Sequence, residues 1–226
     1  MGLGARQLPA VLNNESGRSE RRGAAMSNSK LGFSFKETMS GGFAMGETDP
    51  ASGAEKGKSD VLTMHGTITI DDLDAFIADP KHLGVLDVVM DWSPFGMNLA
   101  APHGVFNLFS PSDDPKLKLM VYEWCLQQSG EWYYFAGHKE VRVHPLRDLW
   151  NDTTTLFTLL YKGKDKTGPV VGAGIISIAP PELVKMVATF KALNAQSVAD
   201  RVRAETEFGR FFLGELWDTY VKKTGT

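Results

Sequence analysis

Two charged side chains in this 226-residue sequence could do chemistry, because each lies on an otherwise apolar face of an expected strand. Alternate residues of a strand point to the same side. Glu123 is the only charge on a face that it shares with Leu117, Leu119, Val121 and Cys125. Lys139 is the only charge on a face that it shares with Tyr133, Phe135, Gly137, Val141 and Val143. A buried ionised group is costly unless it is paired, so the two residues are candidates for a structural ion pair or for a polar anchor of a ligand. The alternative is a location on the surface.

The turn between the two strands decides whether Glu123 and Lys139 meet. Ser129-Gly130 is a hairpin signal. A loop of odd length would bring the two faces together and place Glu123 within diagonal reach of Lys139. A two-residue loop would point them to opposite sides of the sheet. The sequence leaves both registers open.

Other motifs for chemistry are weak. The glycine-rich stretch 168–174 follows a turn and opens a strand, whereas a dinucleotide fingerprint follows a strand and opens a helix. The five histidines lack the spacing of a helical zinc site, and a single cysteine excludes the structural zinc patterns, so we expect neither a metal nor a cofactor. No Gly-x-Ser-x-Gly elbow of a hydrolase is present. Cys125 is expected to be a buried structural cysteine, and His65 to be solvated or to line a cavity.

An antiparallel sheet is predicted to position these residues. From residue 33 to 178 the apolar period is two, which is typical of strands. Tight turns between strands indicate a sheet that closes into a barrel or folds into a sandwich. An eight-stranded barrel is just wide enough to be filled by side chains or to hold one small ligand. The expected strands are 33–45, 61–70, 86–92, 105–109, 117–126, 132–143, 153–161 and 170–178.

The two ends of the chain differ from this middle part. Residues 1–31 carry an excess of three positive charges and no aromatic residue, so we predict that they are disordered; an equal alternative is that Met26 is the true start. The barrel is predicted to occupy residues 32–179. Residues 180–226 are predicted to form helices packed on it, the second of which begins at Ser197 with Asp200 completing a capping box.

The charge and the apolar content of the sequence limit the kinds of partner that we expect. The formal net charge of −3 argues against a nucleic-acid partner. No run of about 18 apolar residues occurs, so no membrane span is expected. No stretch has the apolar core of a signal peptide, and we expect a cytoplasmic protein.

Several phrases resemble a poorly characterised module found beside or fused to bacterial GMC-type, cholesterol-oxidase-like proteins. They are FKETMSG at 35–41, IDDL at 70–73 through DP at 79–80, GVFNLF at 104–109 and DLWNDTTTL at 148–156. The resemblance covers roughly residues 33–178 and implies a link to steroid or lipid metabolism. It transfers no oxidase activity, because the chain has no Gly-x-Gly-x-x-Gly strand–helix unit and no room for a flavin domain, and it carries over no functional residue.

We therefore expect a calycin-like or lipocalin-like antiparallel barrel that binds a hydrophobic small molecule such as a sterol, fatty acid or terpenoid. Glu123 and Lys139 are the expected polar groups. The expected apolar lining is Met64, Phe106, Phe109, Tyr133, Phe135 and Phe157. One alternative is an isomerase or cyclase without a cofactor, which would use Glu123 or His65 as acid or base. Another is an accessory subunit that docks on a GMC-type oxidoreductase through the helix from Phe208 to Tyr220.

Overall fold

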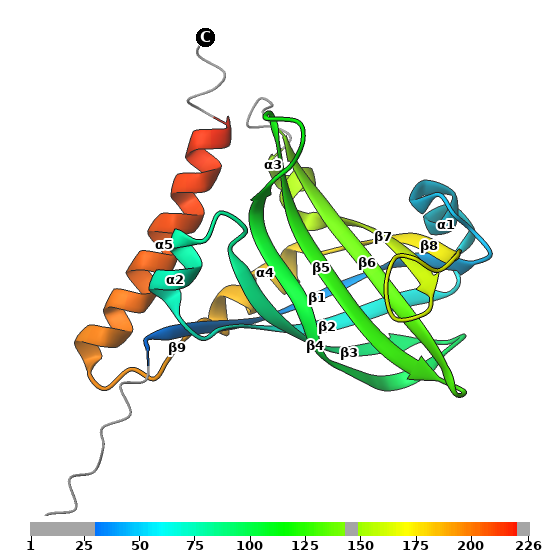
Figure 1. Ribbon diagram of the computed structural model, residues 1–226, viewed down its shortest axis with the longest axis horizontal. Coiled ribbons are helices and arrows are strands. Elements are labelled where there is room, and N and C mark those ends of the chain that lie inside the picture. Colours follow the sequence, from blue (N-terminus) through cyan, green and yellow to red (C-terminus); the bar gives the residue numbers. More distant parts are fainter. Residues whose placement is uncertain (1–29, 143–148, 221–226) are drawn as a thin grey trace, which may run out of the picture.

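The computed structural model of the protein describes residues 30–142 and 149–220. Residues 1–29 lie outside this part. The prediction of disorder for residues 1–31 therefore falls almost entirely outside it, and so does the alternative start at Met26. The described chain is mainly β, and eight antiparallel strands follow one another around a barrel (Figure 1). They are β1 (Gly32–Met45), β2 (Val61–Ile70), β3 (Leu83–Trp92), β4 (Gly96–Pro111), β5 (Leu117–Gln128), β6 (Glu131–Arg142), β7 (Thr155–Lys162) and β8 (Val170–Ser177).

The first strand closes the barrel. The β1 residues Phe33 to Gly42 pair with β2, and the β1 residues from Ser40 to Met45 pair with the last strand, β8. Each of the eight strands therefore has a neighbour on both sides, which removes the exposed edges that an open sheet would have. The eight-stranded antiparallel barrel with C-terminal helices confirms the predicted fold class, and it decides against the sandwich.

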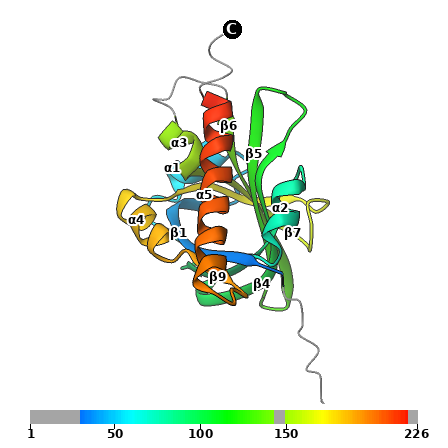
Figure 2. The ribbon, with the colours of Figure 1, turned by 90° about the vertical axis from the view of Figure 1, so that its left-hand side faces the viewer.

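Helices cover one end of the barrel. α5 (Val198–Tyr220) runs across this end, with α2 (Leu73–Ala78) and α4 (Pro180–Ala188) to either side of it (Figure 2). The short strand β9 (Lys191–Leu193) joins α4 to α5 and pairs with the start of β1. Half of the predicted capping box is present, since Ser197 Oγ accepts a hydrogen bond from the Asp200 N–H at 3.0 Å. The Asp200 carboxylate accepts from the N–H of Gln196 instead of that of Ser197.

Two helices and one long strand differ from the prediction. α1 (Pro50–Lys56) and α3 (Leu149–Thr154) were not expected, and α3 includes Thr153 and Thr154, which had been assigned to a strand. β4 is much longer than the expected 105–109. Its residues Asn98, His103 and Phe109 have positive φ, and its register with the neighbouring strands shifts. These irregularities interrupt the period of two, which is why the sequence pattern revealed only a part of the strand.

Aromatic side chains fill a large part of the barrel interior. The rings of Trp124 and Phe135 stack with their centroids 4.9 Å apart, and Phe43 meets Trp92 edge to face at 5.0 Å. Phe95 packs against Trp92 from the turn between β3 and β4. This part of the interior is a packed core, so any ligand pocket must lie elsewhere along the barrel.

None of the helices within residues 30–142 and 149–220 is both long enough and apolar enough to cross a membrane.

The contact between α1 and the barrel supplies a test of the fold. A Cβ atom on Gly53 would lie 2.0 Å from the Ala173 carbonyl oxygen of β8, whereas a Cβ on Gly214 in α5 would have no atom within 4 Å. We expect Gly53→Ala to lower the free energy of unfolding by about 1–3 kcal/mol because the backbone must shift. Gly214→Ala should raise it by up to about 1 kcal/mol through helix propensity. Urea unfolding measures both, and similar effects of the two substitutions would contradict the close packing of α1 on β8.

Candidate functional site

A pocket of about 590 Å³ lies at the end of the barrel that α4 and α5 cover. Its lining is mostly apolar. Barrel strands contribute Phe35, Phe106, Leu108 and Met120, and the helices contribute Leu183, Met186, Phe208 and Phe212. Val187 and Leu213, which also line the pocket, are largely exposed, at 55% and 66%. The pocket therefore has an apolar interior and an apolar rim that faces solvent.

Three ionisable side chains meet at this pocket, which Thr153 and Thr154 also line. Glu37 of β1, Tyr122 of β5 and Lys139 of β6 all line it, although Glu37 is only 4% exposed and Lys139 only 1%. Lys139 Nζ donates a hydrogen bond to Tyr122 Oη at 3.1 Å and lies 3.7 Å from Glu37 Oε2. The ammonium also lies over the Tyr122 ring, 4.7 Å from its centroid. We call these three residues the polar cluster.

Burial changes the proton affinities in the polar cluster. It lowers the pKa of the Lys139 ammonium, and the nearby Glu37 carboxylate opposes that change. Burial, followed by the negative charge of Glu37, raises the pKa of the Tyr122 phenol well above its usual value. The phenol therefore keeps its proton, and Glu37 is the partner that favours the charged form of Lys139.

One oxygen of the polar cluster is unpaired. Glu37 Oε1 is shielded from solvent and has no hydrogen-bond partner among the described residues. Buried acceptors are nearly always satisfied in folded proteins, so an exception calls for an explanation. Trp124 Nε1 and Thr158 Oγ1 are in the same condition, but neither residue lines the pocket.

The predicted lining residues are distributed over three places. Phe106 and Lys139 line the pocket. Met64, Tyr133 and Phe135 do not line it: Met64 is fully buried in the core, and Tyr133 and Phe135 pack against Phe95. Phe109 is buried against Phe211 and Phe212 of α5 and does not line it either. The prediction did not separate the filled part of the barrel from the pocket, because both present inward apolar residues.

Glu123 does not share the pocket with Lys139, which corrects the prediction that both are polar groups of the cavity. Gln128 pairs with Glu131, so the β5–β6 turn has two residues, and both Ser129 and Gly130 have the positive φ that such a turn requires. The two faces therefore point to opposite sides. Glu123 lies on the outer side of the barrel, where it accepts a hydrogen bond from the Tyr134 hydroxyl and pairs with Lys166.

Phe157 is the second correction. In β7 the buried residues are Leu156, Thr158 and Leu160, so Phe157 points outward, and its ring lies beside that of His138. His65 is likewise on the outer side, where its ring contacts Thr38 and Asp91. Neither of the residues expected to serve an isomerase or cyclase, Glu123 and His65, lines the pocket.

Glu37 was missed, although the sequence held a signal for it. In the segment 33–39 the alternate residues are Phe33, Phe35, Glu37 and Met39, so Glu37 is the only charge on an apolar face. The same pattern drew attention to Lys139. Applied to the first strand as well, it would have identified both partners of the buried pair.

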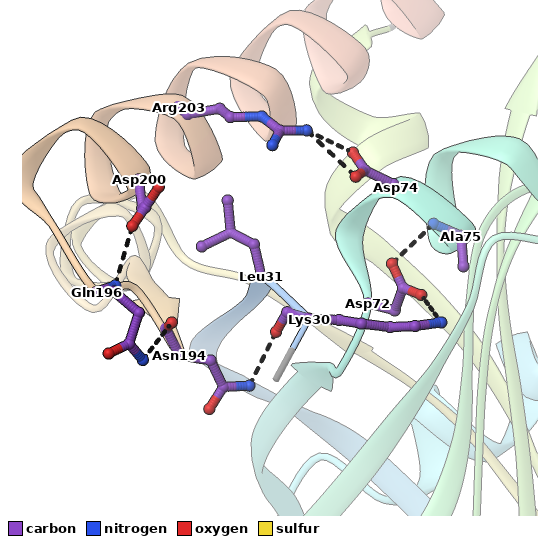
Figure 3. Close-up of a pocket in the computed structure, with 9 residues that line it drawn as sticks. All are labelled: Lys30, Leu31, Asp72, Asp74, Ala75, Asn194, Gln196, Asp200 and Arg203. Carbon is purple, nitrogen blue, oxygen red and sulfur yellow. Dashed lines mark hydrogen bonds and ion pairs between the residues drawn. The ribbon is translucent and has the colours of Figure 1, made fainter. Parts of the chain in front are cut away.

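A second hollow, of about 530 Å³, lies on the outside between α2 and the start of α5 (Figure 3). Its charged side chains pair with one another: Lys30 with Asp72, and Arg203 with Asp74. Asp200 accepts a hydrogen bond from the Gln196 N–H. These contacts join β1, α2 and α5 at the surface, so we interpret the hollow as structural.

Comparison with protein-family models, curated proteins and solved structures found no match for this chain. Among the described residues, no group of three or more His, Cys, Asp or Glu side chains is placed to hold a metal ion. The pocket and its polar cluster are therefore the features of the described chain that bear on function.

The buried pair can be tested by a double-mutant cycle. Lys139→Met should lower the free energy of unfolding by about 3–5 kcal/mol, because it leaves the Glu37 carboxylate buried without a partner. In the double variant Glu37→Leu/Lys139→Met no charge remains, so most of that loss should be recovered. Urea unfolding of the wild type, both single variants and the double variant gives the coupling energy.

Lys166→Met is the matched control, because it removes the partner of Glu123 from the outer side of the barrel. Lys166 is about half exposed, so its loss should cost about 1 kcal/mol or less. Additive effects of the substitutions at 37 and 139 would show that the two side chains do not depend on each other.

Proposed function

We propose that this protein binds a hydrophobic small molecule in the pocket at the α5 end of the barrel. The observation that carries the proposal is a mostly apolar pocket of about 590 Å³ at which three ionisable side chains converge. Small-molecule sites are typically about 300–1,000 Å³, with apolar walls and a few polar groups that fix orientation. The size and the lining of this pocket both agree with that description.

The two parts of the pocket would contribute differently to binding. Apolar walls supply affinity, since each Å² of apolar surface removed from water contributes about 25 cal/mol. The polar cluster supplies orientation, because a ligand gains from a hydrogen bond where its polar group reaches Glu37, Tyr122 or Lys139. A sterol, a fatty acid or a terpenoid has the required apolar body and polar head. The resemblance to modules found beside GMC-type proteins supports a role in lipid or steroid metabolism.

The isomerase or cyclase alternative would use Glu37 as its acid or base, instead of the expected Glu123 or His65. Glu37 is a carboxylate at an apolar pocket, with an amine and a phenol beside it. Such an arrangement can give and take protons. Loss of turnover of a bound ligand in Glu37→Gln, with binding retained, would favour this alternative over simple binding.

The docking alternative loses three of the aromatic residues on which it depended, whereas the side chains of Trp217 and Tyr220 lie outside the described part of the chain. Phe208 stacks on Phe33 at 4.3 Å, Phe211 packs against Phe76 and His82, and Phe212 packs against Phe109. These α5 aromatics are therefore engaged within the protein. An association with a GMC-type oxidoreductase remains a proposal that needs another surface.

A matched pair of glycine variants tests the pocket. Gly209 lines the pocket and Gly214 does not, although both lie in α5 with open space where a Cβ would be. A Phe side chain at 209 would occupy the pocket. We expect Gly209→Phe to weaken binding of Nile red, an uncharged apolar dye, by about tenfold or more, since at least one aromatic ring of space is lost. Gly214→Phe should bind as the wild type does.

Fluorescence titration measures both dissociation constants, and thermal unfolding checks that both variants are folded. Wild-type binding with no difference between the two variants would place the dye outside the pocket. Absence of saturable binding to the wild type would contradict the proposed function.

A further inference from the structure

We propose that the natural occupant of this pocket is an apolar alcohol, whose hydroxyl group donates a hydrogen bond to Glu37 Oε1. The inference rests on the proposed function and names the head group of the ligand. Among the expected ligand classes it selects sterols and terpenoid alcohols over fatty acids. It is argued from the hydrogen-bonding and the charge of the polar cluster.

Glu37 lacks a hydrogen-bond donor for one of its two carboxylate oxygens. Its Oε1 atom is buried at a residue that lines the pocket, and no described residue donates to it. A carboxylate oxygen is only an acceptor, so the missing partner must be a donor. A hydroxyl group supplies one, whereas an ether, an ester or a ketone does not.

The charges of the buried pair favour an uncharged ligand. Glu37 and Lys139 are opposite charges 3.7 Å apart and nearly inaccessible to solvent. A fatty-acid carboxylate bound here would add a second negative charge beside Glu37, and like charges in a poorly solvated site disfavour each other. An uncharged head group leaves the balance of the pair unchanged.

The Lys139 ammonium can still donate a hydrogen bond to a ligand. An ammonium has three N–H donors. Tyr122 Oη at 3.1 Å and Glu37 Oε2 at 3.7 Å face two of them, which leaves one donor for a ligand. A hydroxyl oxygen is an acceptor as well as a donor. An alcohol that donates to Glu37 Oε1 can therefore also accept from Lys139, so one small group would serve both members of the buried pair.

Displacement of Nile red by three twelve-carbon ligands tests the inference. Dodecan-1-ol, dodecanoic acid and 1-methoxydodecane share an apolar chain and differ in their head groups. We expect dodecan-1-ol to bind the wild type about tenfold or more tightly than the ether, the size of a hydrogen bond to a charged group. It should also bind more tightly than the acid at pH 7.

Glu37→Gln should remove the preference for the alcohol over the ether and strengthen binding of the acid, because the carboxylate of the acid can then take the place of Glu37 as the partner of Lys139. If that variant fails to fold, Glu37→Gln/Lys139→Met gives the same test of the alcohol and the ether without a buried charge. Glu123→Gln, which changes a carboxylate on the outer side of the barrel, should keep the wild-type order of the three ligands.

The outcomes separate the two proposals. Equal displacement by all three ligands would show that the pocket binds apolar chains but does not select a hydroxyl, which overturns the inference and leaves the proposed function. Tightest binding of the acid to the wild type would also overturn it, with Lys139 as an anion anchor. Failure of Nile red and of all three ligands to bind would contradict the proposed function itself.

Discussion

The closure of the barrel by β1 is the constraint on which the rest of the structure depends. β1 pairs with β2 along most of its length and with β8 at its end, so the first and last strands of the barrel are joined. Closure turns the inner faces of all eight strands toward one another. It brings Glu37 of β1 to Lys139 of β6, although the two residues are about a hundred positions apart and their strands are not neighbours.

The interior that closure creates has two parts with different roles. Stacked rings such as those of Trp124 and Phe135 fill one part. Toward α5 the walls remain apolar, but they surround a pocket and a buried ion pair. Burial of a charge pair is seldom the best way to stabilise a fold, because the desolvation cost can exceed the attraction. For a pair placed at a pocket, we propose that its role is to orient a ligand.

α5 links this pocket to the outside. Its aromatic residues pack on β1 and β4, which fixes the helix across the end of the barrel. Leu213, on the same helix, lines the pocket and stays exposed. The helix is thus part of the wall as well as the cover of the pocket.

Alternation along the chain predicted much of this structure. It revealed the eight strands, the inward position of Lys139 and the inclusion of Phe106 in the pocket wall. It failed for Glu123, since two alternatives for the turn at Ser129-Gly130 have opposite consequences and only the backbone geometry separates them. It failed for β4, where residues such as Asn98 interrupt the period. The division of the interior into a packed part and a pocket depends on side-chain packing in three dimensions, which no pattern along one strand reports.

A crystal structure of the protein grown with dodecan-1-ol would test the central claim most directly. The account predicts electron density for an elongated apolar chain between Phe106 and α5, with its oxygen within hydrogen-bond distance of Glu37 Oε1. Density for the alcohol only outside the barrel, or inside it with its oxygen away from Glu37, would contradict it.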